Sequence, residues 1–152
     1  MNSKVEIFLN RNFGGFGFSV EFCNFLKIRI NDLNDFEDLS NDDIEMDFED
    51  YDDIIVRTAS SLIKLMREFG IDQCGVSNCQ FIIIPIDKTV IPFISIRDYH
   101  NSESIDFQFE AYWNSICTKD TTNDQIVEKM KAFFAIKKET LDSIKQIKKD
   151  HK

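Results

Sequence analysis

Histidine, proline and glycine are scarce in this sequence, which has 2 His, 2 Pro and 5 Gly among 152 residues. The four cysteines, Cys23, Cys74, Cys79 and Cys117, form no Cys-x-x-Cys pair. Structural zinc sites usually take their ligands from such pairs, with histidine or further cysteine beside them. We therefore expect no metal and no cofactor. We expect the thiols to be buried and reduced, as in cytosolic proteins.

Long apolar runs and basic residues are also in short supply. The apolar run at residues 81–84 is far shorter than the roughly 20 residues that a membrane-spanning helix needs. The chain has 18 Lys and Arg against 27 Asp and Glu, a formal charge of −9. Such a charge repels nucleic acid and anionic lipid surfaces at long range. We expect neither a membrane nor a nucleic acid as partner.

Apolar and aromatic side chains are abundant. Hydrophobic residues make up 43% of the chain, and 15 of them are Phe, which is ample for a core. The length fits one domain that spans residues 1–152.

Three of the five glycines, Gly14, Gly15 and Gly17, lie within residues 10–19. A strand-like run precedes this stretch, and a helix-like run that opens at Ser19 follows it. Glycine adopts positive φ at no steric cost, so the stretch predicts a tight turn with at least one positive φ. Ser19 is expected to cap the helix.

The same turn is a candidate anion site, because a glycine turn at a helix start points backbone N–H groups at a phosphate or carboxylate. The candidate ligand-binding residues are Arg11, Gly15, Gly17, Ser19 and Arg57. Residues that the dinucleotide fingerprint and the P-loop require are missing here. The simpler interpretation is a turn held by core phenylalanines, with Arg57 in a structural ion pair.

Residues 31–53 form an acidic insertion, in which 12 of 23 residues are Asp or Glu and none is basic. Apolar and acidic residues alternate over residues 44–49, which is typical of a half-buried edge strand. Cation binding and mimicry of a phosphate backbone are the functional interpretations. The EF-hand pattern is absent, because no glycine lies among the acids. A solvated insertion is the simpler interpretation.

The remaining pattern predicts helices and antiparallel strands. The expected elements are strands at 4–9, 80–84, 93–97 and 105–109, and helices at 19–29, 58–69 and 122–150. Pro85 and Pro92 are expected to bracket a connection, since proline cannot donate in a central ladder. The expected class is α+β: a small, mainly antiparallel sheet with helices packed on one face, a glycine turn between the first strand and the first helix, and a long C-terminal helix.

Thr122 and Gln125 form a capping box that opens the last helix, residues 122–150. Its apolar stripe covers about seven turns, and its end is rich in lysine. A helix of this length is expected to overhang the domain beyond Lys137, so that removal of residues 142–152 leaves the domain folded. The overhanging part could pack on the acidic insertion, pair with a second copy or bind another protein.

Asp98, His100 and Ser102 have the residue types of a hydrolase triad. Within one short turn they could not easily adopt triad geometry. We therefore assign no catalytic residue.

Four stretches of the chain carry a resemblance to a known group of proteins. They are Asn10-x-x-Phe13-Gly14-Gly15-Phe16-x-x-Ser19, Arg57-Thr58 with Leu62-Ile63 and Glu68-Phe69-Gly70, Ile84-Pro85, and Phe93 to Tyr99 followed by Glu103 and Ile105. Through them, residues 4–107 resemble small uncharacterised proteins of tailed phages and large DNA viruses. The chain departs from that pattern at Ala59-Ser60, where the group usually has Asp-Pro. The resemblance implies a viral origin and an α+β domain, and it carries over no catalytic role.

Two functional hypotheses follow. The first is a small viral accessory protein that binds a protein partner, or a second copy, through the C-terminal helix. Its expected location is the cytoplasm of the host cell or the virion. The alternative is a pocket protein or enzyme for a nucleotide or phosphorylated small molecule at the glycine turn. A DNA mimic, based on the acidic insertion, is a third hypothesis.

Overall fold

The computed structural model describes residues 3–11, 17–30, 54–77, 79–100 and 102–150. The acidic insertion with its expected edge strand lies outside the described residues, as do Gly14 and Gly15. The helices are α1 (Val20–Ile30), α3 (Ile54–Arg57), α4 (Ser60–Phe69), α5 (Phe109–Ile116) and α6 (Asn123–Asp150), with 3-10 turns at Ile71–Gln73 and Lys88–Phe93. The strands are β1 (Lys4–Asn10), β2 (Phe81–Asp87), β3 (Ile94–Tyr99) and β4 (Ser102–Phe107).

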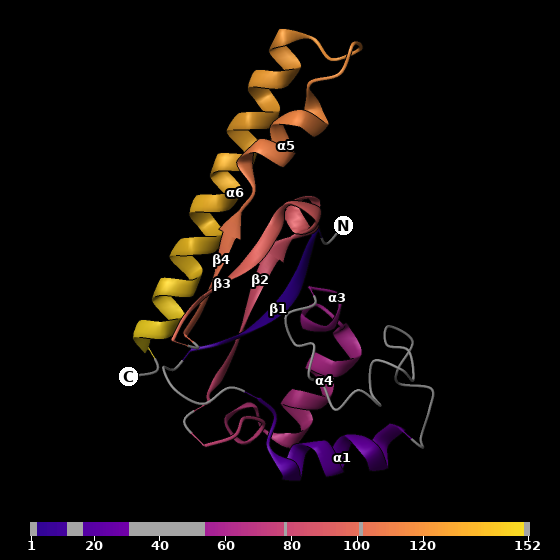
Figure 1. The fold of residues 1–152 in the computed structure, drawn as a ribbon, viewed down its shortest axis with the longest axis vertical. Coiled ribbons are helices and arrows are strands. Elements are labelled where there is room, and N and C mark those ends of the chain that lie inside the picture. The colour runs from indigo at the N-terminus through magenta and orange to yellow at the C-terminus, as the bar shows by residue number, and fades with distance from the viewer. Residues whose placement is uncertain (1–2, 12–16, 31–53, 78, 101, 151–152) are drawn as a thin grey trace.

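The four strands pair as two antiparallel ladders (Figure 1). In the first, β1 pairs with β2 so that Ile7 lies opposite Ile84. In the second, β3 and β4 form a hairpin in which Ile96 lies opposite Ile105. The α+β class, the antiparallel pairing and the long C-terminal helix that the sequence predicted are confirmed. The described strands form two ladders where one sheet was expected.

Helices cover both faces of the β1–β2 ladder, where the sequence indicated one face. Phe8 packs in a cluster with residues of α1 and α4, whereas Ile7 and Leu9 belong to a second cluster with residues of α6. Successive side chains of a strand point to opposite faces, so continuous apolar runs such as residues 81–84 need cover on both sides. Figure 1 shows α4 on one side of the ladder and α6 on the other.

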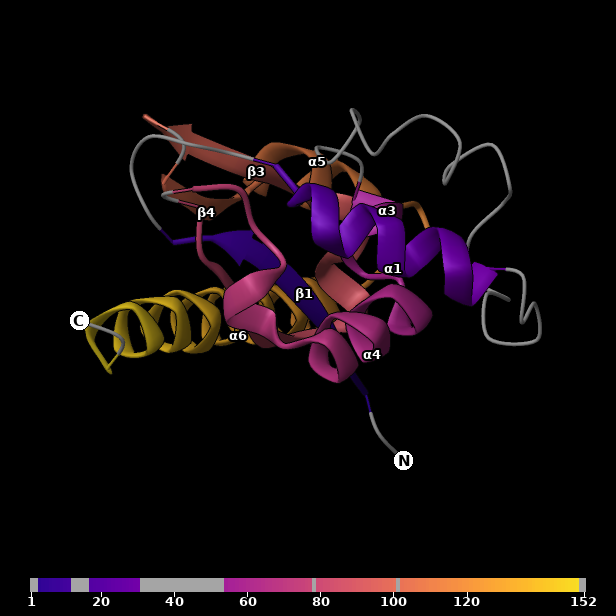
Figure 2. The ribbon, with the colours of Figure 1, turned by 90° about the horizontal axis from the view of Figure 1, so that it is seen from below.

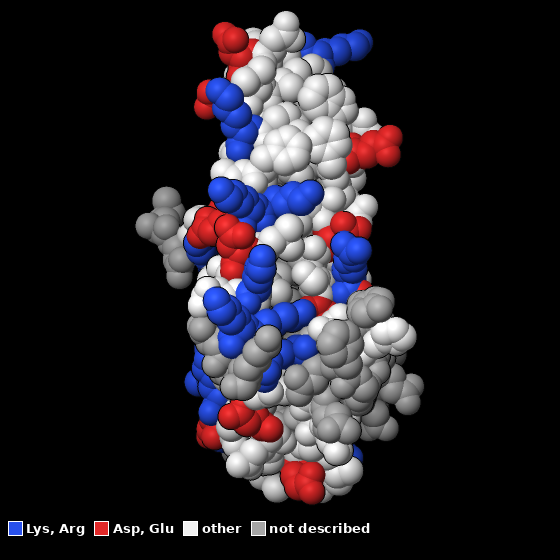
Figure 3. Space-filling view, turned by 90° about the vertical axis from the view of Figure 1, so that its left-hand side faces the viewer, with Lys and Arg blue, Asp and Glu red and all other residues white. Residues whose placement is uncertain are grey.

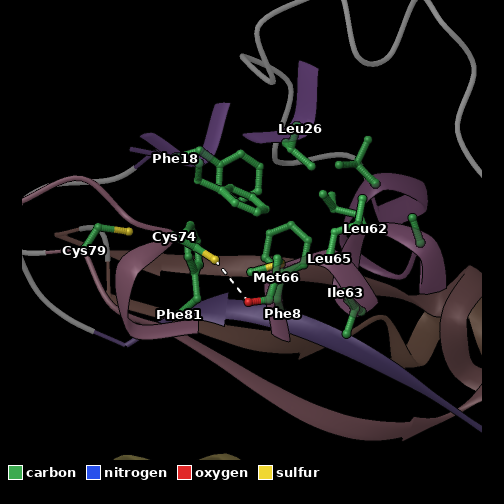
Figure 4. Close-up of a cluster of buried hydrophobic side chains, with 13 residues drawn as sticks. Phe8, Phe18, Leu26, Leu62, Ile63, Leu65, Met66, Cys74, Cys79 and Phe81 are labelled. Carbon is green, nitrogen blue, oxygen red and sulfur yellow. Dashed lines mark hydrogen bonds between the residues drawn. The ribbon is translucent and has the colours of Figure 1, made fainter. Parts of the chain in front are cut away.

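The first cluster contains four buried phenylalanines: Phe8, Phe18, Phe22 and Phe81 (Figure 4). The rings of Phe8 and Phe81 meet edge to face with centroids 5.5 Å apart, and those of Phe18 and Phe22 do so at 5.0 Å. Figure 2 shows α1 and α4 side by side at this end of the molecule. The helix α4 contributes the face that its apolar periodicity predicted: Leu62, Leu65 and Met66.

The helix α4 begins at Ser60, two residues later than predicted, because the short helix α3 precedes it. Both the backbone N–H and the hydroxyl of Thr58 donate to the carbonyl oxygen of Ile54 and so close α3. Ala59 then adopts an extended conformation, from which α4 starts. At the other end, Gly70 has a φ of 109°, the positive value expected of a glycine that ends a helix.

The later elements differ from the prediction at two points. The strand β2 continues through Pro85, which lies opposite Glu6, instead of ending before it. A two-stranded ladder leaves one edge of each strand without a strand neighbour, and proline is tolerated at such edges. After β4, the chain starts α5 at Phe109. There the apolar alternation over residues 105–109 had indicated that the strand continues.

The capping box of α6 is confirmed. The backbone N–H of Thr122 donates to Oε1 of Gln125 at 2.9 Å, and the backbone N–H of Gln125 donates to Oγ1 of Thr122 at 3.2 Å. These reciprocal bonds satisfy donors that a helix start leaves without intrahelical acceptors.

The end of α6 that overhangs is the opposite of the predicted one. Ile144, near the C-terminus of the helix, is 3% exposed in the second cluster, and Leu141 and Ile147 pack beside it. The apolar stripe therefore continues to pack against the core in the C-terminal half of α6. Removal of residues 142–152 would take Ile144 out of the second cluster. The first half of α6 extends beyond the ladders together with α5 (Figure 1). We call these two helical segments the arm.

Ile144→Ala is expected to lower the free energy of unfolding by about 2–5 kcal/mol, because it removes buried atoms and leaves a cavity. Val127→Ala, on the same helix, is the control. Val127 is 50% exposed, so its truncation should cost less than about 0.5 kcal/mol. Urea denaturation of both variants measures the difference. Equal losses would show that the C-terminal half of α6 is not part of the core.

Candidate functional site

The described part of the glycine turn has the backbone that the sequence predicted. Gly17 has a φ of 139°, a value that residues with a Cβ rarely adopt. Ser19 caps α1, because its Oγ accepts the backbone N–H of Phe22 at 3.1 Å. The same hydroxyl donates to the carbonyl oxygen of Gln73 at 2.9 Å. Both expectations for the turn are confirmed.

Hydrogen bonds tie this turn to the segment that follows α4. The backbone N–H of Ser19 donates to the carbonyl oxygen of Cys74 at 2.7 Å, and that of Val76 donates to the carbonyl oxygen of Gly17 at 2.9 Å. The N–H groups of Ser19 and Phe22, which an anion would need, therefore already have acceptors within the protein.

Arg11 and Arg57, which were expected to assist the turn, are engaged elsewhere. The backbone N–H of Arg11 donates to the carbonyl oxygen of Gln80 at 2.8 Å, and its guanidinium donates to the side-chain oxygen of Gln80. Arg57 is the last residue of α3, and its side chain is fully buried. Gly15 lies outside the described residues. An anion site formed by these residues with Gly17 and Ser19 stays a prediction.

The guanidinium of Arg57 forms a bidentate ion pair with the carboxylate of Glu103. The distance is 2.7 Å from Nη1 to Oε1 and 2.6 Å from Nη2 to Oε2, and the two side chains are 0% and 2% exposed. Nη1 also donates to the carbonyl oxygen of Phe8 at 3.1 Å. A buried charge is tolerated where it is paired and hydrogen-bonded in this way. The interpretation of Arg57 as part of a structural ion pair is confirmed.

Glu103 is the centre of this network, and the sequence analysis missed its role. Its Oε1 accepts the backbone N–H of Asn10 at 2.7 Å, and its carbonyl oxygen accepts Nζ of Lys148 at 2.7 Å. With the arginine pair, these bonds join β1, α3, β4 and α6. The signal was in the alternation of β4, because Glu103 shares a strand face with the core residues Ile105 and Phe107.

The turn between β3 and β4 does not assemble a triad from Asp98, His100 and Ser102. The hydroxyl of Ser102 donates to the carbonyl oxygen of Arg11 at 3.0 Å and accepts from Nζ of Lys148 at 3.3 Å. A hydroxyl has one proton to donate, and here it goes to a carbonyl and not to an imidazole. His100 is exposed and has a φ of 50°.

All four cysteines are free thiols. Cys74 and Cys79 are buried, as expected, whereas Cys117 is exposed. Burial raises the pKa of the Cys74 thiol to about 12, with the charge of Asp72 acting in the same direction, and burial also raises the pKa of Cys79. Because the thiolate is the reactive form, these two buried side chains act as core residues.

The arm exposes a group of stacked aromatic side chains. Phe109 and Trp113 of α5 are 44% and 41% exposed, and Phe134 of α6 is 48% exposed. The ring centroid of Phe109 lies 5.5 Å from that of Phe134 and 6.3 Å from that of Trp113. Val127, which is also exposed, precedes Phe134 by about two turns of α6. We call these four residues the aromatic patch.

Side chains outside the aromatic patch fill the seam between α5 and α6. Tyr112 stacks on Phe133 with centroids 4.3 Å apart, and its hydroxyl donates to the carbonyl oxygen of Lys129 at 3.3 Å. These side chains fill the seam between the helices, so the rings beside them stay at its edge. Figure 3 shows a wide uncharged area over the upper part of the molecule, where the arm lies. The sequence analysis missed the patch because it did not predict α5.

Comparison with models of protein families, with curated proteins and with solved structures found no match to this chain. None of the described helices is both long and apolar enough to cross a membrane. The described residues also contain no group of three or more His, Cys, Asp or Glu side chains that could hold a metal ion. The aromatic patch, whose three rings are stacked and exposed, is a candidate functional surface.

Glu103→Gln is expected to lower the free energy of unfolding by about 3–5 kcal/mol, because it leaves the charge of Arg57 buried without its counter-ion. The control, Glu6→Gln, breaks an ion pair with Arg67 in which the two side chains are 42% and 48% exposed. Exposed pairs contribute at most about 1 kcal/mol. Denaturant titration of both variants measures the difference.

A double variant, Arg57→Met with Glu103→Leu, should be more stable than Glu103→Gln alone, since it removes both charges together. A loss in Glu103→Gln no larger than that in Glu6→Gln would contradict the buried pair.

Proposed function

We propose that this protein is a small accessory protein of viral origin that acts by binding a protein partner through the aromatic patch. The observation that carries the proposal is the cluster of Phe109, Trp113 and Phe134, each more than two-fifths exposed and each stacked on another. Single exposed apolar residues are common on protein surfaces, whereas clusters of them mark interaction sites. Aromatic residues also dominate the binding energy of protein interfaces.

The charges on the α6 side of the patch indicate the chemistry of the partner. Lys131 and Lys138 are exposed and lie three residues before and four residues after Phe134 on α6, so they flank its ring on the helix surface. A partner with complementary charge would present an apolar stripe bordered by Asp or Glu. A second copy docking through the same patch would bring these lysines toward their own counterparts, which is unfavourable. We therefore favour a different, acidic-flanked amphipathic segment over a second copy.

The viral part of the proposal rests on the resemblance of residues 4–107 to small proteins of tailed phages and large DNA viruses. For a protein of viral origin, the location that we propose is the cytoplasm of the host cell, with the virion as a second location. The alternative of a nucleotide or phosphosugar pocket at the glycine turn is less well supported. The N–H groups of Ser19 and Phe22 already have acceptors, and Arg57 is paired with Glu103.

Trp113 is the single tryptophan of the chain, so its fluorescence reports on the patch directly. The probe is a synthetic amphipathic helical peptide with a leucine stripe bordered by glutamates. The control peptide has lysines in place of the glutamates. We expect the first peptide to shift the emission of Trp113 to shorter wavelength and to bind more tightly than the second. We expect this preference to shrink at high salt.

The decisive variant is Phe134→Ser, which keeps the tryptophan and should weaken binding about thirtyfold, as for an interface hot spot. Val20→Ser is the matched control, because Val20 is exposed at 71% but lies on α1, away from the arm. The proposal fails if neither peptide shifts the emission or if both variants weaken binding equally. If the emission of Trp113 shifts with protein concentration in the absence of peptide, the partner is a second copy of this chain, and the proposal of an acidic-flanked partner is wrong.

A further inference from the structure

We propose that a groove between the β3–β4 hairpin and the C-terminal half of α6 binds a phosphorylated small molecule of nucleotide size. The groove has a volume of about 610 Å³, which is typical of sites for small molecules. It is separate from the glycine turn, and it does not depend on the protein-binding function proposed for the aromatic patch. Three properties of its lining support the proposal: an excess of cations over carboxylates, a fixed ammonium group and apolar side chains.

The cations are Arg97 of β3 and Lys137 and Lys148 of α6, all of which line the groove. Within the part of the chain that the structure describes, none of the three forms an ion pair with a carboxylate. Asp98 and Asp106 line the groove as well, so the lining carries one positive charge in excess. Figure 3 shows Lys and Arg gathered across the middle of the face that α6 presents.

Lys148 is held in position by the protein. Its Nζ donates to the carbonyl oxygen of Glu103 at 2.7 Å and to the hydroxyl of Ser102 at 3.3 Å. Both acceptors are neutral, and the carboxylate of Glu103 is already paired with Arg57. An ammonium group has three donors, so the two bonds to described residues leave one donor for a ligand.

The environment of Lys148 favours a bound anion. Burial lowers the pKa of its ammonium group, and the charge of Arg11 acts in the same direction, against the opposite influence of Glu103. An anion in the groove would stabilise the charged form and counter both effects. Such a fixed, partly desolvated cation forms stronger hydrogen bonds to phosphate than an exposed lysine does.

The groove also has apolar and hydroxyl groups beside its cations. Ile105 and Leu141 contribute apolar surface, and the hydroxyl of Ser104 lies on the same lining. An inorganic anion would leave the apolar part without a partner. A phosphate attached to a flat or apolar group, as in a nucleotide, would contact both parts.

The overall charge of −9 does not argue against an anionic ligand here. Residues 31–53 hold 12 of the 27 acidic residues and no basic one. The rest of the chain therefore has 15 acidic residues against 18 Lys and Arg, a formal charge of +3. At ordinary salt, charges farther away than about 10 Å are largely screened, so the local lining decides the affinity.

The test uses the full chain with four probes: ATP, AMP, ribose 5-phosphate and inorganic phosphate. We expect ATP and AMP to raise the melting temperature by mass action, and inorganic phosphate to have the smallest effect. Isothermal titration gives the dissociation constants. Arg97→Gln and Lys137→Gln should each weaken ATP binding at least about tenfold, since each removes a charge-assisted contact. Both positions are at least partly exposed, so these variants should fold.

The matched control is Lys145→Gln, because Lys145 is exposed on α6 and does not line the groove. It should leave ATP binding unchanged. The proposal is overturned if none of the four probes binds, or if Lys145→Gln weakens ATP as much as Arg97→Gln does. Tighter binding of a single-stranded oligonucleotide than of ATP, with affinity falling steeply with salt, would assign the surface to nucleic acid and also overturn it.

Discussion

A charge buried in the core constrains how this chain can fold. The guanidinium of Arg57 has no exposed surface, and an unpaired charge at such a place would be strongly destabilising. Glu103 neutralises it and also accepts the backbone N–H of Asn10. A slip of β4 by one residue would move this carboxylate to the opposite face of the strand, away from Arg57. The pair therefore fixes α3, β1 and β4 relative to one another.

The position of α6 follows from the same network. Lys148 donates to the carbonyl oxygen of Glu103, and Ile144 fills the second cluster one turn earlier. A helix of 28 residues is about 42 Å long, whereas strands of six or seven residues span about half that length. With its C-terminal half anchored, α6 has to project past the ladders at its first half. Both proposed binding surfaces, the aromatic patch and the groove, depend on that placement.

Local patterns in the sequence predicted the elements better than their roles. Periodicity found α4, and the capping box found the start of α6, because both signals lie within a few residues. The helix α5 was missed because the alternation that ends at Phe109 continues the pattern of β4. The anchoring of Lys148 was missed because a lysine near a helix end usually lies in solvent. The partner of Arg57 was missed for a related reason: Glu103 is 46 residues away, and only the fold brings the two together.

The two proposed surfaces meet on one turn of α6, and this has a thermodynamic consequence. Phe134 of the aromatic patch and Lys137 of the groove are three residues apart and therefore neighbours on the helix surface. An anion bound at Lys137 would weaken the positive rim that favours an acidic-flanked partner, at a separation within the screening length of about 10 Å. Thermodynamic linkage requires this effect to be mutual, so a bound partner would lower the affinity for the anion by the same factor. Since both sites lie on a helix that the Glu103 network holds in place, their coupling would need no conformational change.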